Sequence, residues 1–147
     1  MIYLKTDEEV ELMRRSNDLL GRTLAEIAKV IRPGVTTAEL DKVAYEFICD
    51  NGGIPSCLGY EGYPATLCTS VNEQVVHGIP SDKVILKDGD IVSVDTVVNL
   101  GGFCADSAYT FPVGEVAPEV LQLMRTTKQA LYLGIEQAIT GRRLGDI

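Results

Sequence analysis

A pair of β-prone runs in the middle of the chain constrains the fold more than any other feature. The first run covers residues 91–98 and the second covers residues 103–111, and together they are rich in β-branched and aromatic residues. Between them lies the sequence Asn99-Leu100-Gly101-Gly102, which suits a tight turn. The pattern predicts an antiparallel hairpin.

The register of this hairpin decides how two aspartates lie. A turn centred between Leu100 and Gly101 places Asp95 directly opposite Asp106, with Cβ atoms about 4.5–5.5 Å apart on one face. We expect this register. A turn centred between Gly101 and Gly102 would leave the aspartates diagonal but still on one face. A loop of odd length would send them to opposite faces.

The two faces of the hairpin differ in character. One carries residues expected in the core: Val92, Val94, Val98, Phe103, Ala105, Tyr109 and Phe111. The aspartate face carries the small or semi-polar residues of a cavity floor: Ser93, Val97, Cys104, Ala108 and Thr110. Opposed like charges destabilise a sheet, and a divalent cation between Asp95 and Asp106 would relieve the repulsion. The alternative is a pair of solvated aspartates on an exposed face.

Capping signals predict three helices around the β-prone region. Residues 6–9 (TDEE) and 36–39 (TTAE) are capping boxes, in which a threonine hydroxyl and a glutamate carboxylate each accept the other residue's amide. The first helix ends at Pro33, and the second ends at residues 51–53 (NGG). A third helix begins at residues 117–119 (APE).

Composition excludes several classes of protein. The chain has 147 residues, enough for one domain, and a formal net charge of −8 with scattered basic residues. A nucleic-acid or membrane-surface binder would need a positive face, so we expect neither. The sequence lacks a long apolar run and a signal peptide. The cysteines match no paired zinc motif, which indicates free thiols and a cytoplasmic protein: Cys49, Cys57, Cys68 and Cys104.

Several motifs together carry a resemblance to a known family. They are residues 57–64 (CLGYEGYP), 70–80 (SVNEQVVHGIP) and 86–92 (LKDGDIV), followed by Asp95 and Asp106 with ten residues between them. The aspartate pair resembles that of the pita-bread metallopeptidases. The other motifs, above all the His-Gly-Ile-Pro segment, resemble the methionine aminopeptidase branch, in its short bacterial-type subclass.

The resemblance implies the fold and the extent of the domain. The fold class is α/β (α+β): half of the pita-bread fold, with an antiparallel sheet and covering helices. We expect residues 1–147 to be the N-terminal half of a single catalytic domain, with the second half absent from this chain. In the family that second half supplies a histidine and two glutamates as further metal ligands, and one of the glutamates is the general base.

The resemblance also implies roles for individual side chains. Asp95 would chelate one metal ion, and Asp106 would bridge two. His77 would hydrogen-bond the substrate near the scissile amide and help to stabilise the tetrahedral intermediate. Sulfur and aromatic groups suit a thioether, and four such residues would line the methionine pocket: Cys57, Tyr60, Tyr63 and Cys68. Taken alone, each of these four would be read as a core or loop residue.

Two positions depart from the family pattern. Glu61 stands where close relatives often carry histidine. The resemblance therefore does not assign the substrate contacts at the pocket entrance. Thr96 and Val97 follow Asp95 in the reverse of the common order. Thr96 should therefore point to the opposite face, so that its hydroxyl gives no support to the metal.

The expected function is removal of the N-terminal methionine from nascent proteins by a metalloaminopeptidase with two divalent metal ions (Co, Mn, Fe or Zn). This chain alone would be inactive, and the full enzyme would be a cytoplasmic monomer without nucleic-acid or membrane partners. One alternative is a related peptidase of the Xaa-Pro aminopeptidase type, against which the His-Gly-Ile-Pro segment argues. The other is a non-catalytic pita-bread binding module, against which the intact aspartate pair argues.

Overall fold

The computed structural model describes residues 3–147, and it has the mixed architecture that the sequence predicts. The helices are α1 (Asp7–Val30), α2 (Thr37–Asp50) and α3 (Pro118–Gln137), with the 3₁₀ turns η1 (Tyr60–Gly62) and η2 (Leu144–Asp146). The strands are β1 (Ile54–Pro55), β2 (Cys68–Val71), β3 (Ile91–Leu100) and β4 (Phe103–Pro112).

Both predicted capping boxes form. At the start of α1, the Glu9 amide donates to the Thr6 hydroxyl at 3.2 Å, and the Thr6 amide donates to the Glu9 carboxylate at 2.8 Å. Thr36 and Glu39 repeat this exchange at the start of α2, at 3.2 and 2.7 Å. Each box satisfies amides that have no partner inside the helix, so it sets the residue at which the helix begins.

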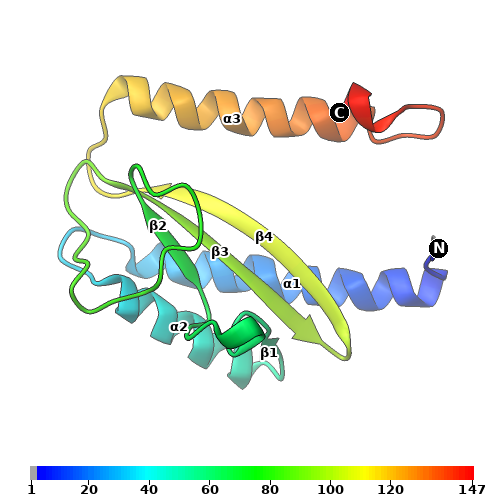
Figure 1. Cartoon of the computed structure of the whole chain (residues 1–147), viewed down its shortest axis with the longest axis horizontal. Coiled ribbons are helices and arrows are strands. Elements are labelled where there is room, and N and C mark those ends of the chain that lie inside the picture. Colours follow the sequence, from blue (N-terminus) through cyan, green and yellow to red (C-terminus); the bar gives the residue numbers. More distant parts are fainter. Residues whose placement is uncertain (1–2) are drawn as a thin grey trace.

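The central strand of the antiparallel sheet is β3 (Figure 1). Along one edge it pairs with β4, from Ile91 opposite Pro112 to Leu100 opposite Phe103. Along its other edge it pairs with β1 near residue 98 and with β2 at residues 92–95. The strands β1 and β2 therefore lie end to end along β3. The chain between them leaves the sheet and returns beside the middle of β3.

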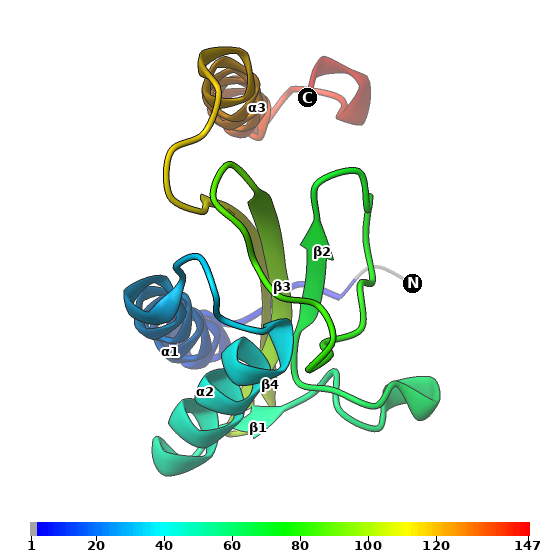
Figure 2. The same cartoon turned by 90° about the vertical axis from the view of Figure 1, so that its left-hand side faces the viewer.

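The helices α1 and α2 lie on the same side of the sheet (Figure 2). Apolar side chains from these helices and from β3 form the core between the two layers: Leu19, Leu20, Ile27, Leu40, Ile48, Val92, Val94 and Val98. The Ser16 hydroxyl ties α1 to the end of the hairpin, because it donates to the Phe103 carbonyl at 2.8 Å. The aspartates lie on the face of the sheet away from these helices.

Tyr109 is less buried than the sequence pattern predicts. It shares the core-facing side of the hairpin and lies opposite Val94, but its side chain is 45% exposed. Its ring packs against Phe111 with 4.8 Å between ring centroids, and the Lys128 amine lies 5.7 Å from the ring centre. Because β4 is the outer strand, with a neighbouring strand on one side only, the large ring extends beyond the cover of the helices.

The third helix lies apart from the other layers (Figure 1). Gly134 is its one buried residue, and Ile147 packs against that glycine. Several apolar side chains along α3 are more than half exposed: Leu123, Leu131, Leu133 and Ile135. No helix within residues 3–147 is long and apolar enough to cross a membrane. The exposed leucines and isoleucine of α3 leave this helix with apolar surface that the core does not cover.

Candidate metal centre and substrate pocket

The hairpin places Asp95 and Asp106 on one face but not directly opposite each other. Asp95 pairs with Ala108, and Asp106 pairs with Val97, so the predicted direct opposition is wrong and the diagonal arrangement holds. The reason lies in the turn. A two-residue turn of the favoured type needs positive φ at both central residues. The residues that meet this need are Gly101 and Gly102, with φ of 64° and 90°.

The two carboxylates affect one another electrostatically. The pKa of Asp95 is raised, first because the group is partly removed from water and second because the charge of Asp106 lies nearby. The charge of His77 and the backbone amide of Thr96 act in the opposite direction. Asp106 itself is exposed. Two carboxylates with this mutual repulsion fit a divalent cation, which favours oxygen ligands and removes the cost of placing like charges together.

Two thiols lie along the edge of β3 next to Asp95. Cys68 pairs directly with Asp95, and the amide just before Cys57 donates to the Val97 carbonyl at 2.8 Å. The pKa values of both thiols are raised, chiefly by burial, and the charge of Asp95 adds to the effect in each case. Asp106 contributes to the shift of Cys57 as well. All four cysteines of the chain lie in its described part and are free, as predicted.

Tyr63 joins the thiols to the segment that carries the histidine. Its hydroxyl lies 2.9 Å from the Leu67 carbonyl and 3.3 Å from the Gly78 carbonyl. The pKa of Tyr63 is strongly raised by burial and then by a hydrogen bond with Cys68. By contrast, Tyr60 lies on η1 with 69% of its surface exposed. The structure thus brings Tyr63 next to Cys68 and Gly78, whereas the side chain of Tyr60 extends into solvent.

The backbone around His77 is held against β2 by the residue that follows it. The Gly78 carbonyl accepts from the Thr69 amide at 2.7 Å, and the Gly78 amide donates to the Ser70 hydroxyl at 3.2 Å. A Cβ atom at Gly78 would overlap the Thr69 carbonyl, so only glycine permits this close approach. His77 itself has a φ of 60°, an uncommon value for a residue with a side chain. The imidazole is exposed and close enough to influence Asp95.

Asp41 holds the chain just before Cys68 and was not identified from the sequence. Its Oδ1 atom accepts from the amides of Thr66 and Leu67 at 2.9 and 2.7 Å, just before the chain enters β2 at Cys68. Burial raises the pKa of Asp41, while these two amides lower it. The only signal in the sequence is an acidic residue beside Leu40 on a helix, which does not reveal a partner more than twenty residues away.

The two departures from the family pattern fall in different places. Thr96 is buried on the core-facing side, where its hydroxyl donates to the Thr66 carbonyl at 2.9 Å. The prediction that Thr96 points away from the aspartates is confirmed. Glu61 lies on η1 with a φ of 48°, and its side chain is exposed. It therefore lies in the same exposed turn as Tyr60.

The arrangement brings two carboxylates together without a full set of metal ligands. Residues 3–147 contain no group of three or more His, Cys, Asp or Glu side chains that could hold a metal ion. Asp95 and Asp106 contribute two carboxylates, and His77 and the thiols lie along the neighbouring strand edge. Two carboxylates alone would leave most of the coordination positions of a divalent cation to water or to other protein groups.

Comparisons with known proteins find relatives that match nearly the whole chain. The chain is 47% identical over all of its 147 residues to the methionine aminopeptidase of Clostridium acetobutylicum, and it spans 59% of that protein's length. The solved structure of methionine aminopeptidase from Thermotoga maritima matches 95% of the chain with a TM-score of 0.90 and 37% identity, over 55% of its own length. The Xaa-Pro dipeptidase of Bacillus anthracis matches 92% of the chain with a TM-score of 0.76, and the chain covers 36% of it; at 22% identity this shows a common fold alone.

The fold prediction is thus confirmed, and the chain is homologous to bacterial methionine aminopeptidases over its whole length. The model of metallopeptidase family M24 matches residues 11–147, which include every residue of the candidate site. On this match, the chain belongs to metallopeptidase family M24.

Proposed function

We propose that this chain is the N-terminal half of a methionine aminopeptidase domain, which removes the first methionine from nascent proteins. The observation that carries the proposal is the placement of Asp95 and Asp106 on one face of the hairpin, with Cys57, Cys68 and His77 along the adjoining edge. The length of the C. acetobutylicum relative, of which the chain spans 59%, supports the proposal that further residues complete the site.

The two aspartates are the proposed metal ligands in this half. Asp95 would chelate one divalent ion, and Asp106 would bridge two ions of Co, Mn, Fe or Zn. When bound, such ions polarise a carbonyl group and lower the pKa of water. The protein's own contribution is to hold two repelling carboxylates on a rigid hairpin, so that their repulsion favours cation binding over the free state.

The residues along the edge of β3 are proposed to hold the substrate. The raised pKa values of Cys57 and Cys68 keep both groups as neutral thiols near neutral pH, which suits the uncharged thioether of methionine. The ring of Tyr63 is fixed by its hydroxyl and can form one side of the same pocket. Tyr60 would line the same pocket from its exposed position on η1.

His77 is proposed to donate a hydrogen bond to the substrate near the scissile amide. The hydrogen bonds of Gly78 hold the backbone next to His77 against β2, and the charge of His77 lowers the pKa of Asp95; both observations support this role. A fixed donor at that point stabilises charge that develops during amide hydrolysis. Its loss should therefore lower turnover more than it weakens metal binding.

We also propose a cellular location, an oligomeric state and a set of partners for the whole protein. The whole protein would act as a cytoplasmic monomer on nascent polypeptides, without nucleic-acid or membrane partners. The net charge of −8 supports the absence of polyanionic partners. The lower identity to the Xaa-Pro dipeptidase, 22% against 47% for the methionine aminopeptidase, favours methionine over Xaa-Pro specificity.

The test is hydrolysis of a Met-Ala-Ser peptide in the presence of Mn or Co. This chain alone should show no appreciable activity, because it lacks a positioned general base, which typically contributes about 10²–10⁴-fold. A chimera that joins residues 1–147 to the C-terminal part of the C. acetobutylicum enzyme should cleave the peptide. His77→Ala in the chimera should reduce kcat, whereas the matched loop variant Asp82→Asn should not.

Two outcomes would contradict the proposal. Robust turnover by this chain alone would show that the site is not half built. A chimera that cleaves an Ala-Pro-Ser peptide faster than Met-Ala-Ser would favour the Xaa-Pro alternative. As for the role of the histidine, an equal loss of metal binding and turnover in His77→Ala would show that His77 is a ligand.

A further inference from the structure

The loop that carries His77 returns to the sheet at a buried glycine. Val75 and Val76, just before the histidine, are 86% and 61% exposed. Gly78, just after it, is buried and lies so close to the Thr69 carbonyl that a Cβ atom would not fit between them. The chain therefore turns at the end of β2, passes through an exposed stretch and comes back beside the strand at Gly78 (Figure 2).

Three hydrogen bonds hold Gly78, and they act on different parts of it. The Thr69 amide and the Tyr63 hydroxyl donate to the Gly78 carbonyl at 2.7 and 3.3 Å. The Gly78 amide donates to the Ser70 hydroxyl at 3.2 Å. The carbonyl lies on the far side of Gly78 from the histidine, whereas the amide belongs to the peptide unit that begins at the His77 Cα atom. Of the three contacts, the Ser70 hydroxyl therefore acts most directly on His77.

The peptide unit between His77 and Gly78 is planar, so a contact that holds its N–H group also orients the plane up to the His77 Cα atom. His77 has a φ of 60°, which a residue with a side chain keeps only where its surroundings hold it. Within residues 3–147, no hydrogen bond other than that of Ser70 reaches this peptide unit. Because Gly78 is the anchored side, the orientation of the unit determines where the imidazole points relative to the sheet.

The position of Ser70 in β2 explains why its hydroxyl is available to the loop. Side chains alternate along a strand, so Ser70 shares a face with Cys68, which pairs with Asp95. Ser70 is only 4% exposed, and water therefore has little access to replace its hydroxyl as the acceptor. The backbone next to His77 is thus tied to the face of the sheet that carries Asp95.

We propose that Ser70 is a positioning residue for His77: its hydroxyl holds the peptide unit between His77 and Gly78, so that the imidazole points toward the substrate. This inference rests on the proposed function, in which His77 donates a hydrogen bond near the scissile amide. Ser70 acts through the histidine and not on the substrate. A serine that only stabilises the fold would leave the catalytic effect of His77 unchanged, and two experiments separate these roles.

The first experiment measures amide hydrogen exchange and imidazole NMR signals in this chain and in Ser70→Ala. His77 is the one histidine of the sequence, so its imidazole signals are recognised without assignment. In Ser70→Ala the Gly78 amide should exchange about ten-fold faster, because it loses its acceptor. The imidazole signals should shift or broaden, while the Thr69 amide stays protected by the Gly78 carbonyl.

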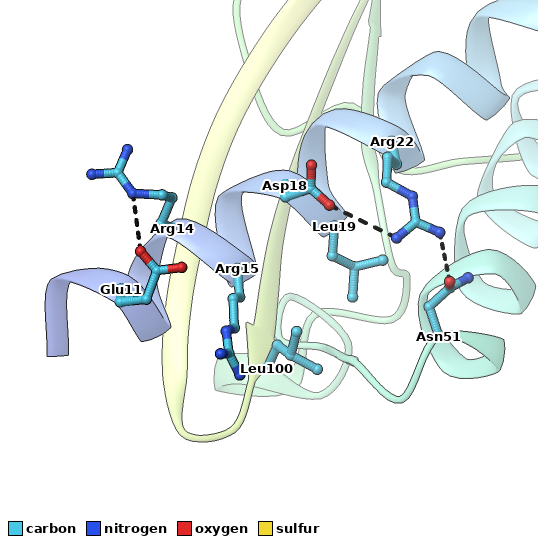
Figure 3. Close-up of a pocket in the computed structure, with 8 residues that line it drawn as sticks. All are labelled: Glu11, Arg14, Arg15, Asp18, Leu19, Arg22, Asn51 and Leu100. Atoms are coloured by element: carbon cyan, nitrogen blue, oxygen red, sulfur yellow. Dashed lines mark hydrogen bonds and ion pairs between the residues drawn. The ribbon is translucent and has the colours of Figure 1, made fainter. Parts of the chain in front are cut away.

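Two control variants remove hydrogen bonds that do not involve His77. Ser81→Ala removes a hydroxyl that accepts the Lys83 amide at 3.1 Å, three residues beyond Gly78. Asn51→Ala removes the acceptor of Arg22, at 2.7 Å, in a hollow on α1 on the opposite side of the sheet (Figure 3). Neither variant should change the imidazole signals, which shows that a loss of stability alone does not move the histidine.

The second experiment is a double-mutant cycle in the chimera with the C-terminal part of the C. acetobutylicum enzyme. Ser70→Ala should lower kcat for Met-Ala-Ser about ten-fold to a hundred-fold and change KM by less than about two-fold, because a misplaced donor stabilises the transition state poorly. In a His77→Ala chimera, the same substitution should change kcat by less than about two-fold, because its effect passes through the imidazole.

Several results would overturn the proposal. One is an unchanged Gly78 exchange rate with unchanged imidazole signals in Ser70→Ala. Another is an equal loss of protection at the Thr69 amide, because Ser70 would then hold the whole segment and not one peptide unit. An equal fall in kcat with and without His77 would show that Ser70 acts independently of it. A chimera with no activity would instead contradict the proposed function, and the exchange measurement would still decide the role of Ser70.

Discussion

Replacing Asp95 by asparagine should stabilise the metal-free chain while it removes metal binding. The asparagine side chain has nearly the same shape as that of aspartate and would keep a polar group at the position opposite Ala108. The substitution would also remove a charge that is partly desolvated and repelled by Asp106. A residue selected for folding alone would not carry this cost. The substitution therefore separates a structural role of Asp95 from a role as a ligand.

The size of the effect follows from the register. Diagonal partners in an antiparallel pair lie about 7–8 Å apart, and two unit charges at that distance repel by about 0.5 kcal/mol in water and about 2 kcal/mol at an effective dielectric constant of 20. Asp106 is exposed and Asp95 is half-buried, so the lower part of this range applies. We expect Asp95→Asn to raise the free energy of unfolding by about 0.5–1 kcal/mol at neutral pH and low salt.

The pH dependence of the free energy of unfolding shows independently whether the charge on Asp95 destabilises the fold. The folded-state pKa of Asp95 lies above its unfolded value, so folding binds a proton between the two pKa values. The free energy of unfolding should therefore fall as pH rises from the unfolded pKa, about 4, through the folded pKa. The increase in the free energy of unfolding caused by Asp95→Asn should be absent below the unfolded pKa. It should grow between the two pKa values and stay constant above the folded pKa.

The assay is urea unfolding of the chain and its variants across this pH range, with EDTA and then with Mn²⁺. Added Mn²⁺ should stabilise the unmodified chain by mass action and should not stabilise Asp95→Asn. Asp82→Asn, in an exposed loop, is the matched control and should show neither effect. A metal-free Asp95→Asn chain that is less stable by about 1 kcal/mol or more would refute the reasoning, because Asp95 would then be making favourable contacts.

Three further substitutions or deletions test the supports of the site. Gly78→Ala should cost about 1–3 kcal/mol in urea unfolding, because the new Cβ overlaps the Thr69 carbonyl; an unchanged midpoint would contradict the packing. Asp41→Ala should cost about 2 kcal/mol, because two amides before β2 lose their acceptor, and the Cys68 thiol should then react faster with a thiol reagent. Removal of residues 118–147 should change the free energy of unfolding by less than about 1 kcal/mol, because α3 contributes little to the core; loss of cooperative unfolding would contradict this.

The parts of the fold that follow local rules could be predicted from the sequence. The capping boxes at Thr6 and Thr36 act between residues three positions apart, so their partners are visible in the sequence. The hairpin was also predictable, but its register was not assigned correctly. A strict requirement for positive φ at both turn residues selects Gly101 and Gly102 over Leu100, and it would have led to the diagonal pair.

The parts that depend on distant contacts could not be predicted in this way. Cys57 and Cys68 meet beside Asp95 because β1 and β2 pair with the same edge of β3, and no local pattern reveals such pairing. The contact of Asp41 with the chain before β2 and the exposure of Tyr109 depend likewise on how layers pack. The roles assigned to single side chains rest on the family resemblance and stay predictions.

The most direct test of the central claim is an NMR titration of the isotope-labelled chain with Mn²⁺. A paramagnetic ion broadens signals of nuclei close to it, so the affected amides locate the ion. We predict that the first signals to broaden are those of Asp95 and Asp106, then those of Cys68 and His77, and that Asp95→Asn and Asp106→Asn remove the effect. Broadening centred on the acidic first turn of α1, or broadening that persists in both variants, would contradict the assignment of these aspartates as the metal ligands.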